Sequence, residues 1–172
     1  PLWSRGLGDV YKRQAHRHPP HGRGTVGMVQ VFPNSRNVIP GRIKFSIDLR
    51  NSTDTLVDAM AAEVKAFADQ VAKEHGVQVH IEMVSSYPAQ LFQPECVQAV
   101  GRAAAKLGYS HMPAVSGAGH DAVYMAKLAP SGMIFIPCKD GISHNEIEDA
   151  KPEHIEAGCN VLLHAMLERA GT

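Results

Sequence analysis

Residues 25–50 read TVGMVQVFPNSRNVIPGRIKFSIDLR, and this stretch decides the fold of the first half of the chain. In its last part, apolar and polar side chains alternate, and the apolar set is Ile43, Phe45, Ile47 and Leu49. Successive side chains of a strand point to opposite faces, so this period of two predicts an antiparallel strand with one buried face. Residues 25–32 alternate in the same manner, and PNSRN between the two runs supplies turn residues.

The segment after Arg50 predicts a long amphipathic helix. Ser52, Thr53 or Asp54 would cap its start, and Gly76 lies just past its end. Apolar residues recur at spacings of three and four, at Leu56, Met60, Val64, Phe67 and Val71. The following VQVHIEMVSS alternates again and predicts a third strand over residues 77–84. Strands with one helix over a sheet face indicate a small α+β sandwich for residues 25–88.

The pattern changes after the proline-broken connection YPAQLFQPE, so we place a domain boundary near residue 88. Residues 89–172 predict helices over 95–109, 122–129 and 151–170. The almost uniformly apolar run SGMIFIPC, residues 131–138, predicts a strand buried on both faces. The expected fold class is therefore α/β, with part of an α+β domain followed by part of an α/β domain.

The overall composition is that of a soluble globular protein, with 44% hydrophobic and 20% charged residues. The 17 basic and 17 acidic side chains cancel, so no global field would attract nucleic acid or an anionic membrane. The apolar runs are far shorter than the roughly 20 residues of a transmembrane helix. The 3 cysteines form no CxxC pair, which indicates reduced thiols. We expect a cytoplasmic protein with neither nucleic acid nor membrane as a partner.

The N-terminal residues 1–14, PLWSRGLGDVYKRQ, show neither helical nor strand periodicity. The part GLGDVYKRQ resembles translated sequencing-adapter DNA, so we interpret residues 1–14 as non-native and expect the natural protein to begin upstream. Residues 15–24, AHRHPPHGRG, are expected to be an unstructured lead-in. Their histidines offer an alternative, adventitious metal-binding tract, but the two prolines favour an unstructured segment.

Two histidines are candidate site residues in the second half. His144 follows the predicted buried strand, at the sheet edge where open α/β sheets bind ligands, and Glu146, Glu148 or Asp149 would orient its ring. Neutral imidazole is a common ligand of divalent metals, but such sites usually need three or more protein ligands, so a solvated loop histidine is the alternative. Ser143 and Asp140 make no nucleophilic triad with His144, since adjacent residues cannot adopt that geometry.

His120 lies in the loop SGAGHD, after Gly117 and Gly119. Glycines there would tolerate strained dihedral angles and allow the backbone to face a ligand. The alternative is a loop-to-helix turn in which Asp121 is the cap.

Three further residues have a functional and a structural interpretation. Arg50 ends its strand and offers a guanidinium fork for a carboxylate, or else is a solvent-facing arginine paired with Asp48 or Asp54. Asn37 would bind an amide or carboxylate, or be a turn residue. Cys138, at the end of an apolar run, is expected to be a buried structural thiol rather than a nucleophile.

The order of three motifs is more specific than any one of them. TVGMVQVFPNSRNVIPGRIKFSIDLR, then SGAGHDA, then MIFIPCKDGISHNEIE together resemble the amidase and carbamoylase branch of the M20 metallopeptidase family. That branch includes N-carbamoyl-L-amino acid hydrolases, allantoate amidohydrolases and β-ureidopropionases. The resemblance implies a catalytic α/β domain with an inserted α+β lid or dimerisation domain. Residues 25–88 would be the second half of the lid, and residues 89–172 the C-terminal part of the catalytic domain.

The resemblance also implies roles for individual residues. His144 matches the family's last metal ligand, and Gly119 and His120 match the segment that closes around the substrate. Asn37 and Arg50 match lid residues that bind the carboxylate side of the substrate, typically in the active site of the partner subunit of a homodimer.

The cofactors implied by the resemblance are two divalent ions, zinc or manganese first, with cobalt or nickel as alternatives. The reaction implied is hydrolysis of a C–N bond of N-carbamoyl-L-amino acids, allantoate or related ureido acids. The general base and the other metal ligands belong upstream, so we assign no catalytic residue here and expect this chain alone to be inactive. The alternative function is a non-catalytic binding or dimerisation module that derives from the same family.

Overall fold

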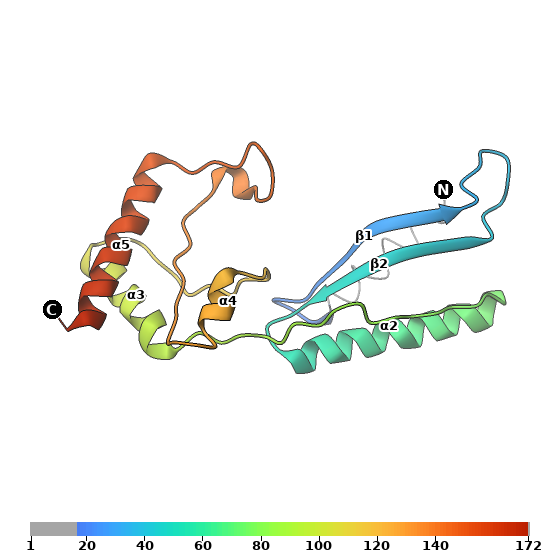
Figure 1. The fold of residues 1–172 in the computed structure, drawn as a ribbon, viewed down its shortest axis with the longest axis horizontal. Coiled ribbons are helices and arrows are strands. Elements are labelled where there is room, and N and C mark those ends of the chain that lie inside the picture. Colours follow the sequence, from blue (N-terminus) through green and yellow to red (C-terminus); the bar gives the residue numbers. More distant parts are fainter. Residues whose placement is uncertain (1–16, 172) are drawn as a thin grey trace. The chain divides into compact units, whose positions relative to one another are not determined.

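The computed structural model describes residues 17–171, and these residues form two compact units that divide between Ala89 and Gln90. The boundary expected from composition lay near residue 88. The first described unit contains a two-stranded sheet and one long helix, and the second contains helices joined by extended segments (Figure 1). Residues 1–14, which we interpret as non-native, lie outside the described residues.

The sheet of the first unit is an antiparallel hairpin of β1, Arg23–Phe32, and β2, Arg42–Arg50. The register pairs Arg23 with Arg50 at one end and Phe32 with Arg42 at the other, with an irregularity between Val26 and Met28. The backbone N–H of Gly41 donates to the carbonyl of Phe32 across the connecting loop, at 3.0 Å. Both strands predicted from the alternating pattern are therefore present and paired.

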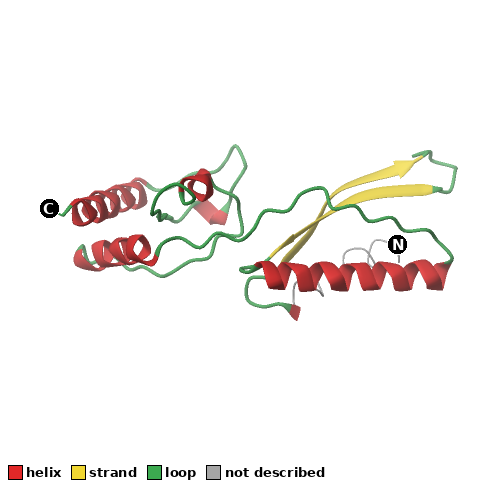
Figure 2. Cartoon of the chain, turned by 60° about the horizontal axis from the view of Figure 1, so that its bottom comes forward, coloured by secondary structure: helices red, strands yellow, loops and turns green. Residues whose placement is uncertain are grey.

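Helix α2, Asp54–His75, lies along one face of this hairpin (Figure 2). Thr53 caps its start, because its side chain accepts a hydrogen bond from the backbone N–H of Leu56. Gly76 ends it with φ of 63°, a left-handed conformation that glycine adopts without steric penalty. From the predicted apolar stripe, Met60 is completely buried, while Phe67 remains 40% exposed. The helix is therefore anchored mainly near its N-terminal half.

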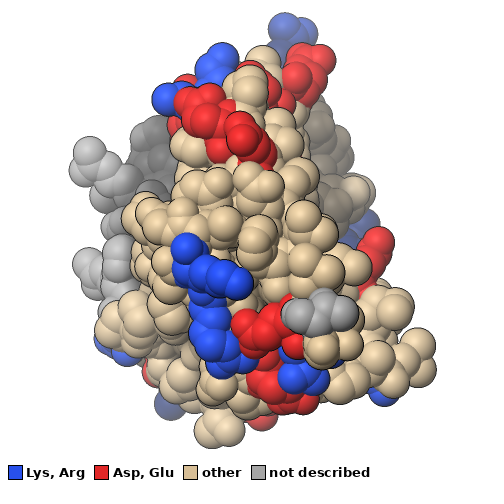
Figure 3. All heavy atoms as spheres, turned by 90° about the vertical axis from the view of Figure 1, so that its left-hand side faces the viewer, with Lys and Arg blue, Asp and Glu red and all other residues tan. Residues whose placement is uncertain are grey.

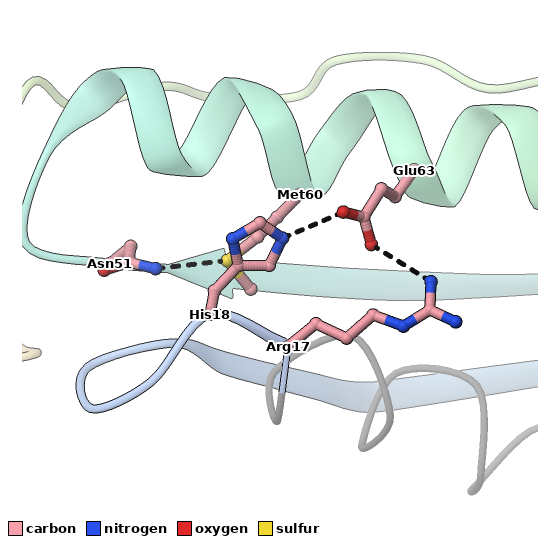
Figure 4. Close-up of polar contacts among 5 residues, drawn as sticks. All are labelled: Arg17, His18, Asn51, Met60 and Glu63. Atoms are coloured by element: carbon pink, nitrogen blue, oxygen red, sulfur yellow. Dashed lines mark hydrogen bonds and ion pairs between the residues drawn. The ribbon is translucent and has the colours of Figure 1, made fainter.

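The predicted unstructured lead-in is wrong for residues 17–24, because this segment is fixed against α2 (Figure 4). Nε2 of His18 lies 3.0 Å from Oε1 of Glu63, and the Arg17 guanidinium lies 3.8 Å from the other carboxylate oxygen. A turn closed by the backbone N–H of Gly22 then leads into β1, which begins at Arg23. A polar segment without periodicity is ordered here by a carboxylate that lies far away in the sequence.

The third strand predicted over residues 77–84 is not formed. Its alternating apolar side chains stay exposed, between 46% for Val79 and 73% for Met83. A strand needs a hydrogen-bonding neighbour, and the described residues pair no segment with this one. The connection ends at Ala89, whose backbone N–H donates to the carboxylate of Asp54 at the start of α2, at 2.7 Å.

The second unit is built on α3, Pro94–Lys106, and α5, Pro152–Ala170, with α4, Asp121–Met125, and a short 3-10 turn, Lys139–Gly141, between them. Helices α3 and α5 pack through small side chains, and the buried set is Ala99, Ala103, Ala104, Val161 and Ala165. Arg102 and Glu168 join the same two helices by an exposed ion pair at 2.6 Å. Small residues at the contact allow the helix backbones to approach closely.

The strand predicted over residues 131–138 is also absent. One side of the segment packs on helices: Ile134 contacts the helical core, and a methyl of Ile136 lies close to Gly158 of α5. Phe135, on the other side, is 52% exposed. A strand buried on both faces needs neighbouring strands to pair with and a layer of helices on each face. The described chain supplies helices on one side only, so the predicted strand does not form.

The charged surface is mixed in sign. On the face seen in Figure 3, Lys and Arg side chains lie near Asp and Glu side chains amid a large uncharged area. None of the helices in the described chain combines the length and the apolar character that a membrane span requires.

Candidate functional site

Arg50 is the last residue of β2, and Asp48 holds its guanidinium in a two-point contact. Nε lies 2.8 Å from one carboxylate oxygen and Nη2 lies 2.9 Å from the other. Residues two apart on a strand share a face, which explains the pairing. The hydrogen bonds that Arg50 donates to Asp48 hold the pKa of Asp48 below its ordinary value and raise the pKa of Arg50. The guanidinium is thus charged and fixed in direction.

Asn37 lies in the loop at the far end of the same hairpin (Figure 1). The hydroxyl of Ser35 donates to its amide oxygen at 2.9 Å. With the oxygen occupied, the amide NH₂ group is the part of Asn37 that remains to donate to a ligand.

Asn37 and Arg50 do not lie together in one copy of the chain. The 9-residue strand β2 separates them. At about 3.3 Å per residue, the two ends of the strand are roughly 25 Å apart. A single small ligand therefore cannot contact both residues of the same copy.

His120 directly precedes α4, and its ring has two neighbours. The hydroxyl oxygen of Ser116 lies 2.6 Å from Nε2, and the ring of Phe135 meets the imidazole edge-to-face with centroids 5.6 Å apart. His120, rather than Asp121, occupies the cap position. Gly119 and Gly117 do not have the positive φ expected for strained glycines, and a side chain at either would meet open space.

His144 lies in the loop between the 3-10 turn and α5, with φ of 57°. The loop is closed by the backbone N–H of Lys139, which donates to the carbonyl of Asp149 at 2.7 Å. Glu148 accepts a hydrogen bond from the backbone N–H of His144 at 2.9 Å. The carboxylate we expected to orient the imidazole through its ring nitrogen thus fixes the backbone instead. A left-handed conformation is uncommon for residues other than glycine, although histidine adopts it more readily than most.

The described residues do not assemble a metal site by themselves. Within residues 17–171, no group of three or more His, Cys, Asp or Glu side chains converges. No hydrogen bond or ion pair in this part of the chain joins His120 to His144. Cys138, expected to be a buried thiol, is exposed.

Comparison with known proteins identifies the family. Residues 16–168 match the sequence profile of peptidase family M20/M25/M40. The chain belongs to this family. The N-carbamoyl-L-amino-acid amidohydrolase of Rhizobium meliloti is 46% identical over 162 residues, which are 94% of this chain and 39% of that protein. The ureidoglycolate hydrolase of Arabidopsis thaliana is 33% identical over 140 residues, 81% of this chain and 29% of that protein.

Solved structures agree with this assignment. The hydantoinase/carbamoylase family amidase of Burkholderia multivorans superposes with a TM-score of 0.92 at 51% identity, over 98% of this chain and 41% of that one. The helices and the small antiparallel sheet therefore match an α/β fragment of this amidase fold, as the sequence predicted. The M20 chain described here spans about two fifths of the length of these two bacterial relatives.

Sequence reasoning missed the partners of two candidate residues. Ser35 and Ser116 contact Asn37 and His120 from two and four residues away. Asp48 was already one of the two expected partners of Arg50. A short polar residue at such a spacing is the signal that points to a local side-chain hydrogen bond. In this M20 chain, these neighbours orient the side chains of Asn37 and His120.

Proposed function

We propose that this chain is the part of an amidohydrolase that helps to bind N-carbamoyl-L-amino acids, or related ureido acids, for hydrolysis of a C–N bond. The observation that carries the proposal is the 46% identity to an N-carbamoyl-L-amino-acid amidohydrolase over 94% of the chain. Allantoate and ureidoglycolate are substrates of the same chemical class, with a ureido group and a carboxylate. The three free thiols suit the reducing cytoplasm, where we place the protein.

Arg50 would bind the carboxylate of the substrate. Its planar guanidinium matches a carboxylate in a two-point contact, and Asp48 already holds it in such a contact. A substrate carboxylate would replace Asp48 in this contact. The amide NH₂ of Asn37 would donate to a carboxylate or carbonyl oxygen, since Ser35 occupies its oxygen.

The separation of Asn37 and Arg50 supports a homodimer as the functional form. The two residues lie at opposite ends of a hairpin about 25 Å long. If both contact one small substrate, they must come from different copies of the chain. We therefore assign to each active site an Arg50 from one subunit and an Asn37 from the other, which requires a symmetric pair.

His144 would be one ligand of the divalent metal pair that the family resemblance implies. A metal of this kind supplies an activated water and polarises a carbonyl. The described residues contribute one candidate imidazole and no converging group of three donors, so they do not fit a complete site. What this chain itself would contribute is binding and orientation of the substrate.

A chimera tests the proposal. Residues 16–168 would replace the corresponding segment of the Rhizobium meliloti amidohydrolase, and hydrolysis of N-carbamoyl-L-amino acids would be compared with that of ureidoglycolate. We expect hydrolysis of the carbamoyl compounds. Arg50→Lys should lower kcat/KM by about 10- to 100-fold, because the two-point contact is lost. Arg36→Lys, in the hairpin loop, is the matched control.

The 172-residue chain alone is expected to hydrolyse none of these compounds, even with zinc or manganese added, since it brings together no three metal donors. A stably folded chimera without activity would sink the hydrolase proposal and favour a binding or dimerisation module. Metal-dependent hydrolysis by the chain alone, lost in His144→Ala, would contradict the expectation that it needs further residues.

A further inference from the structure

The imidazole of His120 is fixed by two neighbours within the described chain. Ser116 contacts Nε2 through its hydroxyl at 2.6 Å, and Phe135 packs edge-to-face against the ring. The same hydroxyl oxygen accepts a hydrogen bond from the backbone N–H of Ala118 at 3.1 Å. Because Ser116 is tied to its own loop, it holds the ring to a fixed point of the backbone.

These contacts favour one direction for the hydrogen bond. A serine hydroxyl has one proton and two lone pairs, and the N–H of Ala118 occupies one lone pair. The proton and the second lone pair remain for Nε2. A distance of 2.6 Å lies within the range for hydroxyl donors and below the usual range for an N–H donor to oxygen, so it favours Ser116 as the donor and Nε2 as the acceptor. A neutral imidazole that accepts at Nε2 carries its own proton on Nδ1.

We propose that Ser116 is a positioning residue that holds His120 in the Nδ1–H tautomer, so that Nδ1 presents a neutral hydrogen-bond donor to a carbonyl oxygen of the ligand. The tautomer rests on the short distance between the Ser116 hydroxyl oxygen and Nε2. The identity of the acceptor rests on the proposed function, since carbamoyl and ureido groups carry such an oxygen. The exposed ring of Phe135 limits rotation of the imidazole and provides an apolar surface beside the donor.

The tautomer can be measured on the whole 172-residue chain without substrate. Long-range proton–nitrogen correlation spectra of a sample with ¹⁵N-labelled histidine distinguish protonated from unprotonated ring nitrogens, and His120→Asn identifies the signals. We expect the Nδ1–H form in the wild type. Ser116→Ala should lower the ratio of Nδ1–H to Nε2–H by about fivefold, the effect of losing one ordinary hydrogen bond. Ser116→Thr should restore the ratio, and Ser110→Ala, at an exposed serine of the same unit, should leave it unchanged.

The role toward the ligand has a separate readout in the chimera. Ser116→Ala should lower kcat/KM for N-carbamoylglycine by about tenfold, and Ser116→Thr should recover most of it. An Nε2–H tautomer in the wild type would overturn the proposal even if Ser116→Ala fails to fold. An unchanged tautomer ratio in a folded Ser116→Ala, or an unchanged kcat/KM in an active chimera, would overturn it as well. An inactive wild-type chimera would instead refute the proposed function, with the tautomer still decided by the spectra.

Discussion

At the scale of single residues, short-range polar partners, rather than deep burial, hold the candidate side chains. The partners lie two or four residues away: Asp48 for Arg50, Ser35 for Asn37 and Ser116 for His120, while Glu148 holds the backbone N–H of His144. Such local bonds form without the rest of a protein, because both groups lie in the same loop or strand. The orientation of these groups is therefore a property of this chain itself.

The carboxyl group of Asp48 is expected to titrate below its ordinary range, because its hydrogen bonds with Arg50 favour the charged form. Since the folded-state pKa is lowered, the pair adds stability above the unfolded-state pKa of about 3.9, and this is lost as pH falls through the folded-state pKa. Both side chains are half exposed, so the contribution stays below about 1 kcal/mol. A pH titration followed by the carbon-13 chemical shift of the Asp48 carboxyl measures its pKa in the folded protein. Arg50→Gln should return the midpoint to the ordinary range, and equal midpoints in the two proteins would refute the pairing in solution.

The backbone at His144 is expected to depend on Glu148. The carboxylate accepts the His144 N–H at 2.9 Å and so stabilises a left-handed residue that is not glycine. In Glu148→Ala, exchange of the His144 amide hydrogen with solvent should accelerate by about fivefold or more, as one hydrogen bond is lost. Glu146→Ala is the matched control from the same loop. Equal exchange rates in the two variants would show that Glu148 does not hold the loop.

At the scale of elements, the sequence predicted those features that depend on local chemistry. The Thr53 cap, the Gly76 end and the buried Met60 follow from short-range rules and from one apolar stripe. The prediction of strands over 77–84 and 131–138 was wrong. The pattern of apolar residues shows which faces of a segment are apolar, but it does not show whether a neighbouring strand is present to pair with. The anchoring of His18 by Glu63 had no local signal, since the two residues are 45 positions apart.

Gly158 is expected to set how closely the extended segment 131–138 approaches α5. A Cβ there would lie 2.8 Å from the Cγ2 methyl of Ile136, a β-branched side chain with little rotamer freedom. Gly158→Ala should lower the free energy of unfolding by about 1–2 kcal/mol, because overpacking outweighs the gain in helix propensity. Gly101→Ala in α3, where the nearest atom is 4.0 Å away, should instead add up to about 1 kcal/mol. Denaturant titration measures both.

The double variant separates the two effects at Gly158. Ile136→Val still carries a methyl at Cγ2, so it should not relieve the contact, whereas Ile136→Ala removes it. If Ile136→Ala fails to reduce the destabilisation caused by Gly158→Ala, the contact with Ile136 is not its source.

At the scale of the whole molecule, the distance between Asn37 and Arg50 decides whether one ligand can contact both. The hairpin presents Asn37 at its loop and Arg50 where it leads into α2 (Figure 1). If both residues bind the proposed ureido acid, each copy of the chain contributes to two separate sites. The sequence motifs named both residues but could not show that the strand between them holds them apart.

Mixed dimers of the chimera test whether Asn37 and Arg50 of different copies form one site. Asn37→Ala and Arg50→Ala should each abolish most activity in homodimers, because every site then lacks one partner. In a mixed dimer of the two variants, one site receives Arg50 from one subunit and Asn37 from the other, while the second site lacks both. Random mixing should restore about a quarter of the wild-type rate, since half of the dimers are mixed and each has one intact site. If both residues served a site within one copy, no mixed dimer would contain an intact site, and mixing would restore nothing.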